Sequence, residues 1–315
     1  MNKIRPLIAG CLCLAAIFVF CTHAFSSEQG EKPARAADIE VAVGVHTKIF
    51  ETADIKDATA AFELWIKKIG EKARVGIETL VYDDLGSLLK DFEQGRLDMV
   101  SVTPLDYLKY VDKKMDSEMA LGGVRDGKMT RKYLLLVRKN TSINSLGELQ
   151  GKSIAMKRDD EVSSLFLNVL LLRERRPEAL SFFSEMKTKK NLSQPVLAVF
   201  FGQADACITT DISFNTVAAL NPQVQERMKV IASSEELLTS VTFFRKGFER
   251  KLKERVVREA VSMKESHEGR QFMLLAMIDG VAQLKETDLG TLKELLAEYT
   301  GMKGKQKGRS RVALP

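Results

Sequence analysis

The sequence predicts an α/β fold of two lobes, each a mainly parallel sheet flanked by helices, joined by a two-strand hinge. From Ile39 onward, short β-branched apolar runs alternate with segments of helical spacing, an order that implies parallel strands covered by helices on both faces. Two strand-like segments, 132–139 and 240–246, flank a self-contained set of such units. If both cross between the lobes, they form the hinge, and a ligand lies at the carboxyl ends of the strands.

The first lobe begins with three strand-and-helix units. We expect the strands over 39–45, 77–82 and 97–104, and the helices over 57–73, 85–95 and 105–111. Gly95 and Pro104 are residues that commonly end a helix and a strand. The lobe takes up 38–134 and 241–301, where 248–300 is expected to be helical throughout.

The second lobe takes up 135–240 and repeats this alternation. Its strands are expected over 152–156, 182–188, 205–210 and 228–234, and its helices over 161–174, 193–202 and 212–220. The pair Asn221-Pro222 ends the last of these helices.

Residues 1–24 have the pattern of a secretory signal peptide. Lys3 and Arg5 precede an apolar run from Leu7 to Phe20, and Ala24 offers a small residue for cleavage. An uncleaved membrane anchor is the alternative, although the run is short for a full span. Lipid attachment at Cys21 is disfavoured by the bulky residues before it. We therefore expect an exported, periplasmic protein.

Charge and cysteine content indicate which partners and which covalent links to expect. Of the net charge of +6, two units come from Lys3 and Arg5 and five from the basic residues after Gly301, so the remainder carries −1. A nearly neutral charge on the rest of the chain does not indicate a nucleic-acid partner. The basic, Gly-rich segment 302–315 is expected to be a disordered tail, with attraction to an anionic membrane as the alternative. Cys207 is the one cysteine left after signal removal, and its apolar neighbours predict a buried side chain.

The turn Lys157–Ser164, KRDDEVSS, joins a predicted strand to a predicted helix. Such helix starts commonly hold an anion, because their backbone N–H groups are free and the helix dipole is positive there. This turn instead carries Asp159, Asp160 and Glu161. Asp160 or Ser163 could equally be ordinary N-capping residues.

Three stretches carry a resemblance to a known family. They are SLLKDFEQGRLDMVSVTPLDYL, KYLLLVRKNTSINSLGELQGKSIAM and FFGQADACITTD. In order and spacing, from about Ile39 to Arg245, the chain resembles the substrate-binding proteins of phosphate, phosphite and phosphonate ABC transporters. That resemblance implies the type 2 periplasmic binding protein fold.

The family's anion turn is where the chain departs from this pattern. The resemblance implies a Ser-Thr-Ser-Gly cluster there, and Glu161, Val162, Ser163 and Ser164 occupy its four positions, so that only Ser163 matches. A carboxylate about 4 Å from a bound dianion repels it by about 1 kcal/mol per charge pair in water. Each lost hydroxyl donor removes roughly 1.5–3 kcal/mol more. We therefore expect an altered ligand, unless Lys157 or Arg158 compensates.

Other candidate ligand contacts follow strand ends. Tyr107 matches the family's cleft tyrosine, and Asp211 matches an acid that the family uses near its ligand. Thr103, Thr210 and Thr47 also lie at strand ends that face the predicted cleft. Each has a plainer alternative: a half-buried aromatic for Tyr107, a strand-end or capping role for the others. With Glu161 and Asp211 in the cleft, a cationic or zwitterionic ligand is as reasonable as an oxyanion.

The expected function is that of a solute-binding protein. It captures a small molecule by hinge closure and delivers it, as a monomer, to an ABC transporter permease with its ATPase. The alternatives are a periplasmic sensor that docks on a membrane receptor, an enzyme on the same fold, and an interaction protein that has lost its ligand. Motifs of the HExxH, CxxC, GxSxG or P-loop type do not occur, so we expect neither catalysis nor a metal or cofactor.

Overall fold

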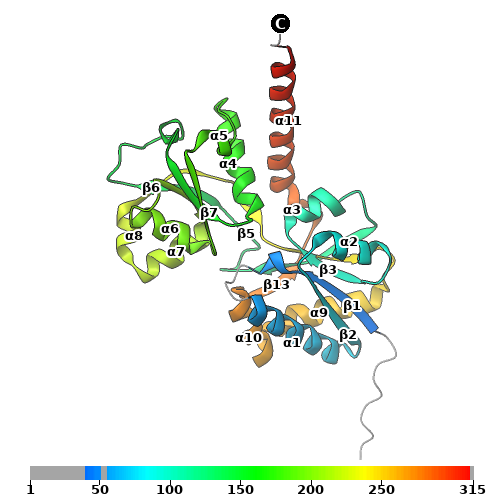
Figure 1. The fold of residues 1–315 in the computed structure, drawn as a ribbon. Helices are drawn as coiled ribbons and strands as arrows, with labels where there is room; N and C mark the ends of the chain where they lie inside the picture. Colours follow the sequence, from blue (N-terminus) through cyan, green and yellow to red (C-terminus); the bar gives the residue numbers. More distant parts are fainter. Residues whose placement is uncertain (1–39, 51–54, 313–315) are drawn as a thin grey trace, which may run out of the picture. The chain divides into compact units, whose positions relative to one another are not determined.

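The computed structural model describes residues 40–50 and 55–312, with side chains described as far as Gly304. The predicted signal segment 1–24 lies outside these residues. The described strands form a six-stranded sheet, a five-stranded sheet and a two-stranded ribbon (Figure 1). We call the parts built on the two large sheets lobe I and lobe II.

The lobe I sheet has the strand order β13-β4-β12-β3-β1-β2. In chain order its strands are β1 (Glu40–His46), β2 (Gly76–Tyr82), β3 (Met99–Val102), β4 (Ser117–Val124), β12 (Val241–Arg245) and β13 (Gly280–Gln283). Strand β1 pairs in parallel with β2 and β3, whereas β12 pairs antiparallel with β3 and β4, and β13 with β4.

Helices cover both faces of this sheet (Figure 1). One face carries α1 (Ile55–Ala73), α9 (Arg250–Ser262) and α10 (His267–Ala276), and the other carries α2 (Leu85–Glu93) and α3 (Pro104–Asp106), which continues into the π-helical turn η2 (Tyr107–Val111). Helix α1 buries Phe62, Trp65, Ile66 and Ile69, a spacing that places these side chains on one stripe of the helix.

The lobe II sheet has the order β10-β6-β9-β7-β8. Its strands are β6 (Tyr133–Arg138), β7 (Ser153–Lys157), β8 (Glu185–Lys189), β9 (Ala206–Thr210) and β10 (Met228–Ser233). One face carries α4 (Glu161–Arg173) and α5 (Ala179–Phe182), and the other carries α6 (Ser193–Phe200), α7 (Asp211–Leu220) and α8 (Pro222–Arg227) (Figure 1). The two lobes also contain short 3₁₀ turns, which are η1 (Thr47–Ile49), η3 (Gly147–Leu149), η4 (Met263–Glu265) and η5 (Glu286–Leu289).

The α/β fold class is confirmed, but both sheets are mixed and not mainly parallel. Strand β7 pairs in parallel with β8 and β9, while β6 pairs antiparallel with β9 and β10. The difference arises because strands that enter a sheet from the other lobe, such as β6 and β12, run opposite to the central parallel strands. In addition, 248–300 is not helical throughout, since β13 interrupts it.

The hinge pair differs from the expected one. Segments 132–139 and 240–246 are sheet strands, β6 and β12. The two connections between the sheets pass instead through β5 (Thr130–Arg131) and β11 (Leu237–Leu238), which pair antiparallel. These connecting segments form a two-strand link between lobe I and lobe II.

The expectation of a disordered segment 302–315 is wrong for 302–312. Helix α11 runs from Gly290 to Val312, because lysine, arginine and glutamine are good helix formers and their cations suit a helix C-terminus. The sequence assigned this region to lobe I as far as residue 301. In the structure, its apolar side chains pack against the lobe II core, and they are Leu292, Leu295, Leu296, Tyr299 and Met302. Arg173 on α4 makes a bidentate ion pair with Glu298, at 2.7 and 2.8 Å.

Candidate functional site

A cavity of about 220 Å³, which we call the cleft, is lined by loops of both lobes and by the link between them. Its lining comprises Thr47–Phe50, Ile55, Thr103–Asp106, Arg131, Tyr133, Lys157–Val162, Lys190, Leu192, Leu238 and Thr239. Most of these residues follow the carboxyl ends of β1, β3, β7 and β8. Ligand sites of open α/β sheets lie at such strand ends.

The turn after β7 is organised by Asp160. Asp159 adopts a left-handed conformation, with φ of 55°, which aspartate tolerates better than most residues. The Asp160 carboxylate then caps α4 by accepting from the Ser163 backbone N–H at 3.0 Å and from the Ser163 hydroxyl at 2.6 Å. The Ser164 hydroxyl donates to the Asp160 carbonyl at 3.1 Å. Both serine hydroxyls therefore donate within the chain.

Glu161, the first residue of α4, is engaged by two lysines of lobe I. Lys109 Nζ lies 2.5 Å from Oε2 and Lys48 Nζ lies 3.3 Å from Oε1. Burial alone would raise the pKa of Glu161, but the two ammonium groups outweigh it and hold the pKa below its usual value. The side chain is 43 % exposed, so water screens both pairs and each contributes less than about 1 kcal/mol. A carboxylate of the chain itself thus occupies the helix start.

A buried polar pair supports the lobe I side of the cleft. His46 Nδ1 lies 3.6 Å from Asp106 Oδ2, and both side chains are almost fully buried. Burial alone would raise the pKa of Asp106, but the His46 ring and the Thr103 hydroxyl lower it below its usual value. Next to this pair, the Thr47 hydroxyl donates to Asp83 at 2.8 Å. These contacts fix the loop that follows β1.

Three cations of the cleft have no side-chain partner within the part of the chain that the structure describes. The side chains of Lys157, Arg158 and Lys190 form none of the hydrogen bonds or ion pairs found among the described residues. They come from neighbouring strand ends, because β7 and β8 pair in parallel with Lys157 opposite Lys189. The Arg158 N–H also donates to the Lys189 carbonyl at 2.8 Å. The cleft therefore presents a cluster of positive charge on its lobe II side.

Of the predicted site residues, Thr47, Thr103 and Glu161 line the cleft. Ser163 lies behind the turn, fully buried, and Ser164 lines a separate cavity next to α11. Thr103 also caps α3, since its hydroxyl accepts from the Asp106 N–H at 3.1 Å.

Tyr107, Thr210 and Asp211 lie outside the cleft lining. Tyr107 is 5 % exposed and packs in the core with its ring 5.2 Å from that of Phe243, and this burial raises the pKa of its hydroxyl. Thr210 caps α7 by accepting from the Ser213 N–H at 3.2 Å. The Asp211 carboxylate accepts from the Lys132 N–H at 3.2 Å. Ligand-binding roles for these three residues stay predictions.

Sequence reasoning anticipated Lys157 and Arg158 only as compensating groups and missed Lys190. A signal for Lys190 existed, because it directly follows the strand expected over 182–188. Asp106 was also missed, since nothing in a single sequence pairs it with His46. Among the described residues, the structure holds no group of histidine, cysteine, aspartate or glutamate side chains suited to a metal ion. No helix within the described ranges has the length and apolar character to cross a membrane.

Known proteins resemble this chain over most of its length. A search of curated proteins returns no match. Among solved structures, a binding protein component of an ABC phosphonate transporter from Pseudomonas aeruginosa superposes with a TM-score of 0.60 at 12 % identity, covering 84 % of this chain and 88 % of its own. PhnD1 from Prochlorococcus marinus, solved with methylphosphonate, gives 0.60 at 12 % identity, covering 81 % and 96 %. A Xanthomonas citri protein bound to ATP gives 0.60 at 16 %, covering 84 % and 98 %.

These likenesses show the two-lobed fold of periplasmic binding proteins. The family model described as the phosphonate periplasmic substrate-binding protein of ABC transporters matches residues 49–289. That match includes the β5 and β11 link and every strand of the lobe II sheet. The chain therefore belongs to the periplasmic phosphonate-binding protein family of ABC transporters.

Proposed function

We propose that this protein binds a small anionic or zwitterionic solute in the cleft, closes about the β5 and β11 link, and delivers the solute to an ABC permease and its ATPase. The observation that carries the proposal is the cluster of Lys157, Arg158 and Lys190. Their side chains have no partner among the described residues, whereas Glu161 is already neutralised by two lysines. A negatively charged group would satisfy these cations.

The same geometry argues against a phosphonate held by the helix start. The serine hydroxyls that could grip its oxygens donate to Asp160. Glu161, at the first position of α4, already engages Lys48 and Lys109, so these cations are not free to bind a phosphonate there. We therefore favour a carboxylate or another singly charged anion, held by flexible cationic side chains. A purely cationic solute is disfavoured, because the Glu161 charge is taken up by Lys48 and Lys109.

In this role the protein acts without catalysis, in the periplasm after signal removal, and as a monomer. The family supports the permease and the ATPase as partners. A single polypeptide supplies both sides of the cleft, so binding needs no second copy.

A thermal-shift screen of residues 25–315 tests this function. It would include phosphate, phosphonates, carboxylates, amino acids, sulfonates and polyamines. A solute at a hundred times its dissociation constant adds about 2.7 kcal/mol to the free energy of unfolding, which is readily seen as a higher melting temperature. Lys190→Gln should weaken the response to anions about tenfold, while Lys251→Gln, an exposed site on α9, should leave it unchanged. A response to polyamines alone would contradict the proposal.

A second function rests on the pairing of Glu161 with Lys48 and Lys109. Because these pairs join the two lobes, the chain could close on its own carboxylate and act without a solute, as an interaction protein or a sensor docking on a membrane receptor. Small-angle scattering distinguishes this case. Glu161→Gln should then open the protein in the absence of any solute, whereas a solute-driven protein keeps the same scattering in both forms and compacts only when its anion is added.

A further inference from the structure

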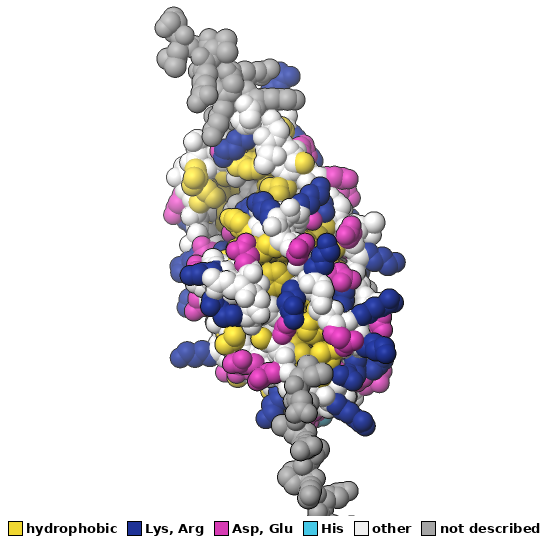
Figure 2. Space-filling model, turned by 90° about the vertical axis from the view of Figure 1, so that its right-hand side faces the viewer, with side chains coloured by type: hydrophobic (Ala, Val, Ile, Leu, Met, Phe, Trp, Pro, Cys, Tyr) yellow, Lys and Arg dark blue, Asp and Glu magenta, His cyan; other side chains and the backbone are white. Residues whose placement is uncertain are grey.

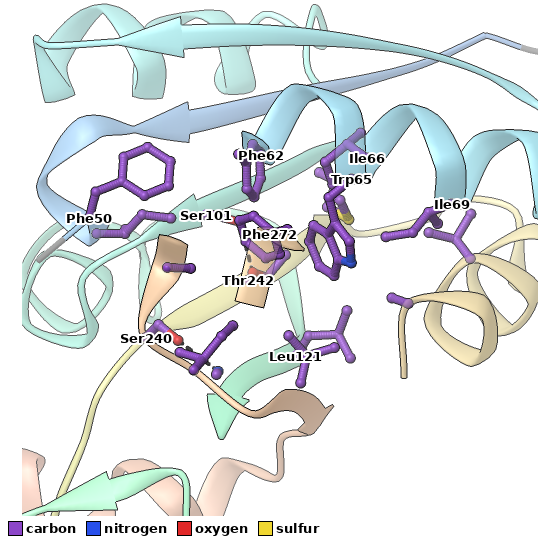
Figure 3. Close-up of a pocket in the computed structure, with 18 of the residues that line it drawn as sticks. Phe50, Phe62, Trp65, Ile66, Ile69, Ser101, Leu121, Ser240, Thr242 and Phe272 are labelled. Atoms are coloured by element: carbon purple, nitrogen blue, oxygen red, sulfur yellow. Dashed lines mark hydrogen bonds between the residues drawn. The ribbon is translucent and has the colours of Figure 1, made fainter. Parts of the chain in front are cut away.

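A second cavity, which we call the lobe I cavity, lies inside lobe I between the sheet and helices α1, α9 and α10 (Figure 3). Its volume is about 80 Å³. Four aromatic rings form a continuous wall, with Trp65 stacked on Phe272 at 4.5 Å and Phe62 within 6 Å of Phe50, Trp65 and Phe272. None of the described residues that line it carries a charged side chain.

An unpartnered polar atom faces this apolar space. The Nε1 of Trp65 is buried and has no hydrogen-bond acceptor among the described residues, and the side chain as a whole is 5 % exposed. In Figure 3 the indole nitrogen lies on the side of the ring toward Ile69 and Leu121. Buried N–H groups nearly always find an acceptor, and a buried tryptophan usually satisfies its own. The Trp65 N–H therefore lacks the acceptor that a buried donor normally has, and a bound molecule could supply it.

The hydroxyl groups of the strand residues Ser101 and Thr242 and of Ser240, which directly precedes β12, add to this polarity. The Ser240 hydroxyl accepts from the Gly123 N–H at 2.8 Å, and no acceptor for its own hydrogen occurs among the described contacts. Ser101 and Thr242 share one hydrogen bond of 2.7 Å, so the hydrogen of one of them is also available. The lobe I cavity thus offers several neutral donors within an apolar wall.

We propose that the lobe I cavity binds a small, uncharged, apolar molecule that carries one hydrogen-bond acceptor, such as a short ketone. An ion is excluded by the lack of a charged partner, since a buried ion without one is very costly. An apolar cavity of about 150 Å³ accommodates benzene, which has six carbon atoms, so a cavity of about 80 Å³ suits a molecule of roughly three or four non-hydrogen atoms. The acceptor would take the hydrogen of Trp65 Nε1. This site is separate from the cleft and does not depend on the proposed function.

Titration of the full chain with acetone, a ketone of four non-hydrogen atoms, tests the proposal. Trp65 is the single tryptophan of the sequence, so its emission reports directly on the cavity. We expect a saturable change in the emission spectrum, in contrast to the linear loss that collisional quenching produces. The melting temperature should rise over the same concentration range. If the emission changes only linearly and the melting temperature stays constant, the proposal is overturned.

Two variants separate the hydrogen bond from apolar filling. Trp65→Phe should weaken acetone binding about tenfold relative to the binding of isobutene in the thermal-shift titration, because this hydrocarbon has the shape of acetone but no acceptor, and both ligands experience the same change in cavity volume. Ala260→Leu fills the cavity and should abolish binding of both, whereas Ala297→Leu, exposed on α11, should affect neither. Equal binding of the ketone to Trp65→Phe and to the parent chain would overturn the role of the indole. If Trp65→Phe does not fold, Ala260→Leu still decides whether the cavity is the site.

Discussion

Asp160 joins the cleft turn to helix α4 through its hydrogen bonds to Ser163. Asp160→Ala removes this N-cap and leaves the buried Ser163 hydroxyl without its acceptor, so we expect the free energy of unfolding to fall by about 1–2 kcal/mol. Urea denaturation measures the change. Asp159→Asn makes the same charge change nearby while keeping a residue suited to the left-handed conformation, and it should cost less than about 0.5 kcal/mol. Equal costs would mean that charge, and not capping, governs this turn.

Glu161 places a carboxylate at the first position of helix α4, on the rim of the cleft. Glu161→Ser removes the carboxylate, releases Lys48 and Lys109, and places a hydroxyl at the helix start. We expect methylphosphonate affinity, measured by calorimetry, to rise at least tenfold, because a carboxylate is removed from the cleft and Lys48, which lines it, loses its partner. Stability should change by less than about 1 kcal/mol, since the lost ion pairs are exposed. The control Glu226→Ser, exposed on α8, should bind as the parent does. An unchanged ligand profile in Glu161→Ser would contradict this account.

At the scale of elements, helix α11 ties the end of the chain to lobe II. Leu292 is 1 % exposed and packs in the lobe II core. Leu292→Ala should therefore cost about 2–5 kcal/mol and speed amide hydrogen exchange in α4 more than in α1. Leu274→Ala, at a side chain that is 80 % exposed, should change neither quantity. Faster exchange confined to α1 would show that α11 belongs energetically to lobe I.

The elements that sequence reasoning found are those with a clear period. Helix α1 and strand β1 carry strong apolar patterns, and their predicted bounds lie close to those observed. Strand β4 was missed because its sequence, SEMALGGV, contains two glycines and little β-branched character. The β5 and β11 link consists of two residues on each side, which is too short for any periodicity. The pairing of β5 with β11 depends on the whole fold, which brings these two distant segments together.

At the scale of the molecule, the order of strands predicted the fold class and the strand ends that meet in the cleft. Thr47, Thr103 and Glu161, which were chosen because they follow strand ends, all line the cleft, and their contacts with a ligand stay predictions. Tyr107 was chosen from a family resemblance, and its ring packs against Phe243 outside the cleft lining, a placement that depends on tertiary packing. On the face shown in Figure 2, basic and acidic side chains alternate over the described residues. The cation cluster of the cleft is therefore a local feature that overall charge does not reveal.

We expect the stability of the whole molecule to depend on pH through the buried carboxyl group of Asp106. In the folded chain the pKa of Asp106 lies below its usual value, because the His46 ring and the Thr103 hydroxyl outweigh burial. The unfolded chain then binds more protons in acid. The stabilisation is complete above the unfolded pKa, about 3.9, and is lost as the pH falls through the lower folded pKa. We expect the urea midpoint to fall between about pH 5 and pH 2, and Asp106→Asn to reduce this fall. Asp116→Asn, at a side chain 86 % exposed, should retain the parent profile. A profile unchanged by Asp106→Asn would assign the acid sensitivity to other carboxyl groups, Glu161 first among them, because its pKa is lowered as well.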